Sequence, residues 1–139
     1  MIAPGAQEFQ LRNLRLEMGL VRSVKMALGG GIVIYAEGTD LVDQALACLK
    51  FYQSESCGKC VPCRIGTTKL VEIGADLHAG EMTAAEADAL MSAKDGGLVF
   101  ELAQVMAETA ICGLGNIAAL PLHSLLKYFP EDVKQRVRA

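Results

Sequence analysis

The chain has 139 residues, of which 52% are apolar and 21% are charged, and its formal net charge is −3. This composition is typical of one modest globular domain, and it excludes disorder over most of the length as well as a general nucleic-acid-binding surface. No apolar run reaches the roughly 18 to 20 residues that a membrane-spanning helix requires. The first residues also lack the order of a signal peptide. We therefore expect a protein without direct membrane insertion or nucleic-acid partners, in a reducing compartment, most simply the cytoplasm.

Residues 1–38 are predicted to form an N-terminal extension with one short strand. The apolar residues of 1–28 follow no single period, so this stretch is assigned to neither helix nor strand. The strand is predicted within Ile32-Val33-Ile34-Tyr35, a β-branched run bounded by glycines. Three glycines at 29–31 precede it and match neither nucleotide-binding pattern, so tight backbone packing is favoured over phosphate binding. The basic residues of the extension fit a solvated face or an edge docked on an acidic partner: Arg12, Arg15, Arg22 and Lys25.

Residues 39–139 are predicted to form a helical domain, because the apolar period changes to 3.6 from Thr39 onward. The first helix is capped by Thr39 or Asp40 and ends near residues 54–56. The second follows Cys63 and closes at Gly80.

Three further helices follow in the second half of the chain. A capping box of Thr83 and Glu86 opens one helix, and the next runs from Leu98 into Cys112. The last starts or is interrupted at Pro121, with one or two more turns from Pro130. The fold class is therefore mainly α, a small helical bundle with a short β segment ahead of it.

Four of the five cysteines form the pattern that bears most directly on function. Cys57, Cys60 and Cys63 follow the spacing C-x-x-C-x-x-C, and Cys112 lies far downstream in Ile-Cys-Gly-Leu-Gly. Three thiolates on one short loop with a distant fourth are typical ligands of a cuboidal iron–sulfur cluster. The sequence therefore predicts that these four cysteines bind one 4Fe–4S cluster and that the protein transfers electrons.

Zinc is the main alternative for the four sulfurs. A structural zinc site commonly uses two C-x-x-C pairs, and here Cys112 alone stands in place of the second pair. Iron–sulfur is therefore favoured. The fifth cysteine, Cys48, lies in an apolar helical pattern and is expected to be an ordinary buried thiol.

Several neighbours of the cysteines suit such a loop. Pro62 is expected to stiffen the turn between the second and third ligands, and a cation near the cluster, Lys59 or Arg64, either tunes its potential or points to solvent. Glycines are expected to free the backbone around the ligands and let N–H groups approach the cluster: Gly58, Gly66, Gly113 and Gly115.

No catalytic constellation competes with the metal site. His78 stands at a predicted helix end, and His123 lies beside Leu122, so structural roles are favoured for both. A thiol-oxidoreductase role for C-x-x-C is disfavoured, because a third cysteine at ligand spacing follows at once.

The segment from Glu55 to Gly66, which holds three of the cysteines, resembles the NADH-binding flavoprotein subunit of NADH:quinone oxidoreductase. The same module is similar to the diaphorase subunit of NAD-linked hydrogenases and the β subunit of NAD-dependent formate dehydrogenases. The match extends to residues 30–34 and 39–42 upstream and to 109–115 and 121–126 downstream, so it covers about residues 28–138. The resemblance implies that Cys57, Cys60, Cys63 and Cys112 bind a 4Fe–4S cluster in a helical bundle.

In that family the cluster takes electrons that come from NADH through FMN and passes them to iron–sulfur centres on neighbouring subunits. The family's FMN and NADH sites are not recognisable here, so FMN and NAD are expected only on a missing region or a partner chain. We expect an electron-transfer subunit or domain of a larger NADH- or formate-linked complex, not catalytic alone. The alternatives are a metal-stapled structural or interaction module with no redox role, and a piece of a complete NADH-oxidising enzyme.

Overall fold

A computed structural model describes residues 17, 19, 33–91 and 97–138 of the chain. The chain divides into two compact units, Met1–Thr39 and Asp40–Ala139. We propose that the boundary near residue 39 also separates two functional parts, the N-terminal extension and the helical domain. Among the described residues, no helix combines the length and the apolar character needed to cross a bilayer.

The first unit corrects the predicted strand. Val33, Ile34 and Tyr35 have no regular secondary structure, and all three are exposed. A β-branched run becomes a strand only when its backbone N–H and C=O groups pair with a neighbouring strand. No named strand exists in the described ranges to supply that partner. Ile32 and the glycines at 29–31, like the basic residues of the extension, lie outside the described residues.

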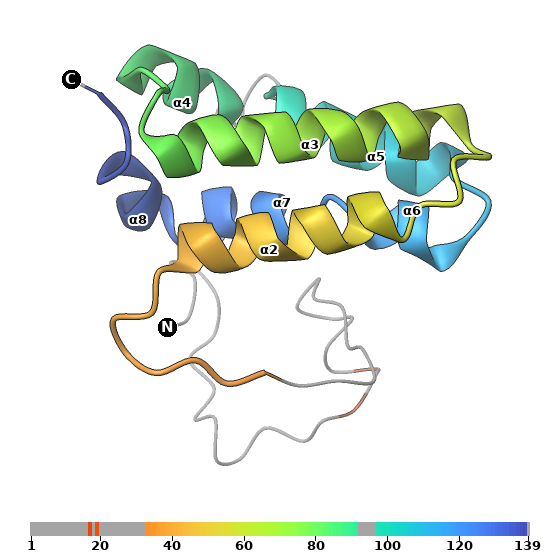
Figure 1. The fold of residues 1–139 in the computed structure, drawn as a ribbon, viewed down its shortest axis with the longest axis horizontal. Coiled ribbons are helices and arrows are strands. Elements are labelled where there is room, and N and C mark those ends of the chain that lie inside the picture. The colour runs from red at the N-terminus through yellow and green to blue at the C-terminus, as the bar shows by residue number, and fades with distance from the viewer. Residues whose placement is uncertain (1–16, 18, 20–32, 92–96, 139) are drawn as a thin grey trace. The chain divides into compact units, whose positions relative to one another are not determined.

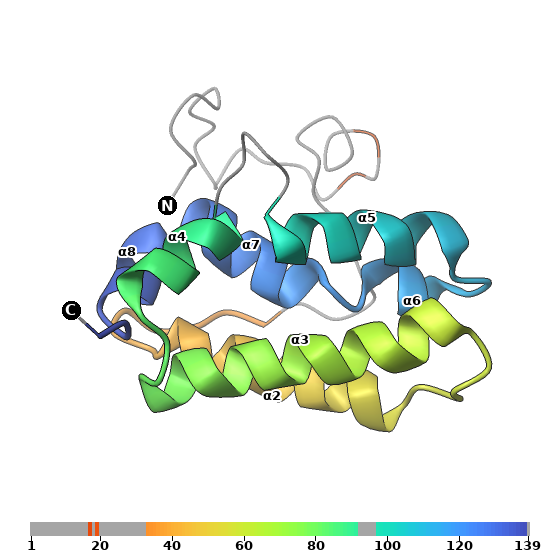
Figure 2. The same cartoon turned by 90° about the horizontal axis from the view of Figure 1, so that it is seen from above.

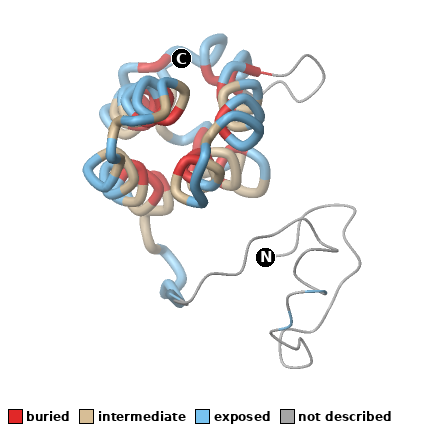
Figure 3. The backbone as a smooth tube through the Cα atoms, turned by 90° about the vertical axis from the view of Figure 1, so that its right-hand side faces the viewer, coloured by how far each residue is buried: buried red, intermediate tan, exposed pale blue. Residues whose placement is uncertain are grey.

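The second unit is helical, as predicted, and its elements are shown in Figure 1. Their bounds are α2 Leu41–Ser54, α3 Val61–Ala79, α4 Ala84–Met91, α5 Leu98–Thr109, α6 Gly113–Ile117, α7 Leu120–Tyr128 and α8 Pro130–Lys134. Helices α2 and α3 lie side by side, with α7 next to α2 and α5 next to α3 (Figure 2). Seen from one end, the four longer helices enclose a common centre (Figure 3). The architecture is a four-helix bundle with three shorter helices at its ends.

The predicted helix ends agree with the structure at several positions. Asp40 caps α2, because its carboxylate accepts hydrogen bonds from the N–H groups of Val42 and Asp43. Gly80 ends α3 in the left-handed conformation, with φ 68°. The capping box before α4 is present, since the N–H of Thr83 donates to Glu86 Oε2 at 2.8 Å and the N–H of Glu86 to Thr83 Oγ1 at 3.3 Å.

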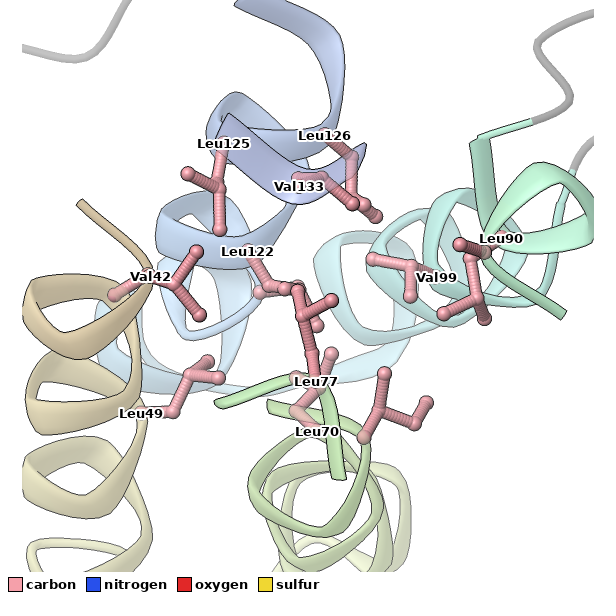
Figure 4. Packing of buried hydrophobic residues seen from close by; sticks show 14 of the residues in the cluster. Val42, Leu49, Leu70, Leu77, Leu90, Val99, Leu122, Leu125, Leu126 and Val133 are labelled. Carbon is pink, nitrogen blue, oxygen red and sulfur yellow. The ribbon is translucent and has the colours of Figure 1, made fainter. Parts of the chain in front are cut away.

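The core lies where the four longer helices face one another. In α2 the buried positions are Val42, Ala45, Leu46 and Leu49, which recur at the spacing of one helix face. Side chains from α3 and α7 pack against this face, and α5 adds side chains to the same core cluster (Figure 4). Each fully buried leucine or valine contributes about 1.5 to 3 kcal/mol of transfer free energy. The largest fully buried side chains among the described residues are Leu49, Leu70, Leu77, Val99, Met106, Leu122 and Val133.

Two glycines allow α3 to approach its neighbours closely. A Cβ at Gly66 would lie 2.5 Å from Met106 Sδ of α5, and a Cβ at Gly74 would lie 2.9 Å from Leu49 Cδ1 of α2. The predicted role of Gly66 was therefore wrong, because this residue is buried inside α3 and serves helix packing.

The C-terminal residues close the end of the bundle where α2 begins. The guanidinium of Arg136 pairs with Asp40, the cap of α2, and also donates to the carbonyl of His78 near the end of α3. Arg138 donates from Nε to the Gly80 carbonyl at 2.8 Å and forms an isolated bridge with Thr83. These contacts fix the starts of α2 and α4 to the end of α3.

Candidate metal centre

The four predicted ligands come from two stretches of chain at the other end of α2. Cys57 lies in the loop between α2 and α3, Cys60 is the N-cap of α3, and Cys63 lies in the first turn of that helix. Cys112 is the N-cap of α6, directly after α5. Cys57 and Cys112 are exposed, Cys60 is half-buried and Cys63 is buried. This places Pro62 inside α3, at a position where proline is favoured, and not in a loop as predicted.

All four cysteines line one cavity of about 110 Å³. Its wall is completed by residues from the same two stretches: Glu55, Ser56, Lys59, Ala110 and Leu114. In the part of the chain that the structure describes, no group of three or more His, Cys, Asp or Glu side chains forms a site for a single metal ion. A 4Fe–4S cluster requires a wider spacing of the sulfurs than a single metal ion does, because each thiolate would bind a different iron. Four soft sulfur donors around one small cavity fit that cofactor.

The loop that carries Cys57 is held in shape by local hydrogen bonds. Gly58 has φ 72°, which confirms that this position needs a glycine. Its carbonyl accepts a hydrogen bond from Arg64 Nη1 at 2.6 Å, and its N–H donates to Ser56 Oγ at 3.3 Å. Arg64 therefore bonds to the loop backbone, whereas Lys59 lines the cavity.

The segment that follows Cys112 is a short helix, α6, of which Cys112 is the N-cap. Neither Gly113 nor Gly115 has a positive φ, so the prediction that they free the backbone was wrong. Gly115 is needed for close approach instead, since a Cβ there would lie 2.5 Å from Ala110 Cβ and 3.4 Å from Cys63 Sγ. Asn116 joins α6 to α5 by donating from Nδ2 to the Ala107 carbonyl. Gly115 thus lets the Cys112 segment lie directly against Cys63.

Backbone N–H groups favour negative charge at this site. The amides of Gly115 and Leu114 lower the pKa of the exposed Cys112 thiol below its ordinary value, against a small opposing effect of burial. Cys60 and Cys63 stand at the N-terminus of α3, the positive end of the helix dipole. Two helix N-termini therefore border the cavity.

Sequence reasoning missed one polar neighbour of the sulfurs, Ser56. Its Oγ lies 3.4 Å from Cys63 Sγ. The serine stands next to Cys57 in the sequence, but nothing in the spacing shows that it contacts the third cysteine of the motif. That contact appears only when α3 turns Cys63 back toward the loop.

The remaining cysteine and the histidines lie outside this cavity. Cys48 is half-buried in α2, less enclosed than predicted. His78 lies 3.4 Å from Asp43 through its Nε2 atom, and His123 lies edge-to-face against Phe100 with ring centroids 4.5 Å apart. Structural roles are thus consistent with the surroundings of both histidines.

A second, larger cavity of about 500 Å³ lies among α3, α4 and α5. Its lining combines three acids with apolar side chains: Ile73, Asp76, Glu81, Met82, Glu86, Ala89, Leu90 and Leu98. Glu86 serves the capping box, whose N–H and hydroxyl groups at Thr83 lower the pKa of its carboxyl. No cysteine is among these residues, so size alone does not make this cavity the metal centre.

Comparison with known proteins agrees with the cysteine geometry. Residues 43–136 match the family model of the NADH-ubiquinone oxidoreductase-F iron–sulfur binding region. The chain belongs to this family. Its cofactor is a 4Fe–4S cluster.

Similar proteins include the F subunits of NADH-quinone oxidoreductase from three Rickettsia species. The chain is 30% identical to the Rickettsia rickettsii (strain Sheila Smith) protein over 93% of its own length and 29% of that protein. The identity is 30% to the Rickettsia bellii (strain OSU 85-389) protein, over 88% of this chain and 28% of the relative. The identity to the Rickettsia typhi (strain ATCC VR-144 / Wilmington) protein is 29%, over 92% of this chain and 28% of the relative. The chain therefore spans less than a third of the length of these curated relatives.

Proposed function

We propose that Cys57, Cys60, Cys63 and Cys112 bind one 4Fe–4S cluster in the cavity that they line. The observation that carries the proposal is the convergence of two separate stretches of chain on one small space. Cys60, Cys63 and Cys112 lie at or in the first turn of a helix, and Cys57 lies in the preceding loop. Amides at a helix N-terminus stabilise thiolates. Gly58 provides the left-handed turn of the Cys57 loop, and Gly115 lets the Cys112 segment lie close to Cys63.

We propose further that the chain relays electrons within a larger NADH- or formate-linked oxidoreductase complex. When bound, a 4Fe–4S cluster accepts and releases one electron at a time. The relatives are named as subunits of NADH-quinone oxidoreductase, which supports other subunits as partners. We propose that those partners carry a flavin and further iron–sulfur clusters. FMN and NAD would bind outside the residues described here, on another region or chain. A cytoplasmic location remains a prediction from the cysteine pattern.

An electron partner would dock at the cysteine end of the bundle, because electron transfer requires a short path to the cluster. Exposed apolar side chains next to the proposed ligands support docking at this end of the bundle. Val61 and Ile65 lie one turn apart on α3 and are 53% and 59% exposed, and Ile111, beside Cys112, is 81% exposed. Exposed apolar side chains of this kind are common where protein partners bind.

The test is iron and sulfide analysis with EPR spectroscopy of the reduced, anaerobically purified protein. We expect about four irons and four sulfides per chain, as the cluster formula requires. Cys112→Ser should weaken or abolish the EPR signal, because one of four thiolate ligands is replaced by a poorer one. Cys48→Ser is the matched control and should leave the signal unchanged, since Cys48 does not line the cavity.

Two results would contradict the proposal. The ligand assignment fails if Cys48→Ser removes the signal and Cys112→Ser does not. A colourless protein that carries zinc would instead support the metal-stapled structural module, in which the metal fastens the α2–α3 loop to α6 and carries no electrons.

A further inference from the structure

The hydroxyl of Ser56 lies within hydrogen-bond distance of one of the four cysteine sulfurs. Its Oγ lies 3.4 Å from Cys63 Sγ, and both residues line the same cavity. In the described ranges, no other side-chain hydroxyl has a hydrogen-bond contact with a cysteine sulfur. Cys63 is also the most buried of the four, with 7% of its surface exposed. Water therefore competes little for this sulfur, and the contact acts in surroundings of low polarity.

The direction of this hydrogen bond follows from the neighbouring groups. The N–H of Gly58 donates to Ser56 Oγ at 3.3 Å, which uses one acceptor site of the oxygen. On its other side, the Gly58 carbonyl accepts a hydrogen bond from Arg64 Nη1 at 2.6 Å, so this glycine is held through both its N–H and its C=O. The hydroxyl proton stays free to point at Cys63. A metal-bound thiolate carries no proton, so Ser56 must be the donor and the Cys63 sulfur the acceptor.

We propose that Ser56 donates a hydrogen bond to the Cys63 thiolate and thereby raises the reduction potential of the cluster. This inference rests on the cluster proposed above. On reduction one electron enters from an external donor, no bond breaks, and the proton stays on the Ser56 oxygen. The added negative charge spreads onto the ligand sulfurs, so the O–H···S bond is stronger in the reduced state. Hydrogen bonds to the sulfurs are among the factors that set the potential of such clusters.

The experiment compares variants as intact, cluster-loaded protein in an anaerobic dithionite titration followed by EPR. Ser56→Ala should lower the equilibrium constant for reduction about three- to tenfold, where tenfold equals about 59 mV for one electron. Ser56→Thr keeps the hydroxyl and should keep the potential near that of the wild type. Ser54→Ala is the matched control, because Ser54 Oγ bonds to the Phe51 carbonyl at 2.9 Å and contacts no cysteine.

The outcomes separate this inference from the proposed function. Absence of iron, sulfide and the EPR signal in the wild type refutes the cluster itself. A fully loaded Ser56→Ala protein with unchanged potential refutes only the role of Ser56. If Ser56→Ala loads poorly, resonance Raman spectra of its loaded fraction and of the wild type in H₂O and D₂O decide, because backbone N–H groups exchange equally in both proteins. A smaller exchange shift of the iron–cysteine stretching bands in Ser56→Ala supports the hydrogen bond, and an equal shift overturns it.

Discussion

Gly58 and Gly80 show how single residues set the two ends of α3. Both have a left-handed φ, 72° and 68°, which side chains other than glycine rarely adopt. Gly58 bends the loop that carries Cys57, whereas Gly80 ends the helix. At these two positions the backbone conformation itself requires the glycine.

His123 gives the fold a pH dependence that can be measured. Burial lowers its pKa, and the positive charge of Lys127 lowers it further. The unfolded chain therefore takes up the proton at higher pH than the folded protein does. The stability of the fold should be fully present above the unfolded pKa of about 6.5 and decline as the pH falls from there toward the lowered folded value.

Urea unfolding of the wild type and of His123→Gln at several values between pH 5 and pH 8 tests this sign. The wild type should lose more stability toward low pH than the variant, because the variant lacks the titrating imidazole. His78 is present in both proteins and serves as an internal control. Equal slopes in the two proteins would show that His123 does not contribute.

The cysteine pattern made the site largely predictable at the residue scale. Four thiol donors were identified by spacing, and the structure brings them to one cavity. Ser56 and Gly115 were not identified for what they do, because the contact of Ser56 with Cys63 depends on how α3 meets the preceding loop, and the packing of Gly115 on Cys63 depends on how α3 and α6 meet. Such contacts are properties of the tertiary structure and leave no periodic signal in the sequence.

At the scale of elements, the helices were predictable because their apolar residues repeat with a period of 3.6. The start of α3 was placed too late, after Cys63, although Pro62 is a favoured residue in the first turn of a helix. Helix α6 was missed because five residues are too few to show a period. The strand was wrong because β propensity depends on a neighbouring strand to pair with.

The contact between α3 and α5 depends on Gly66, and a larger side chain there should separate the two helices. The added side chain of Gly66→Val would press against Met106, which is fully buried. We therefore expect the free energy of unfolding to fall by about 1 to 3 kcal/mol because of overpacking. Chemical denaturation measures the loss. Met106→Ala makes room, so the double variant should lose less than the sum of the two single variants. Strict additivity would show that the two residues do not share this contact.

On the scale of the helical unit, Asp40–Ala139, the two ends of the bundle have different roles. The cysteine end joins the α2–α3 loop to α6 around one cavity. The other end joins residues 96 positions apart through the ion pair of Arg136 and Asp40. Sequence reasoning found the cap at Asp40 but not the pair, because no local pattern links two charges so distant in the chain. The helical unit thus separates the proposed metal centre from the contacts that hold its helix ends.

This separation predicts that damage at the Asp40 end lowers stability and spares the cluster. Asp40→Ala removes both the cap of α2 and the ion pair. Loss of the cap alone should lower the free energy of unfolding by about 0.5 to 2 kcal/mol. Arg136→Gln removes the part-exposed ion pair, which is worth about 0 to 1 kcal/mol, and the hydrogen bond to the His78 carbonyl, but it leaves the Asp40 cap in place and should therefore lower stability less than Asp40→Ala. Thermal unfolding followed by circular dichroism ranks the variants, and EPR spectra of the same samples should match that of the wild type. A changed cluster signal in Asp40→Ala would mean that the two ends are coupled through α2, since that helix alone connects Asp40 directly to the cysteine loop.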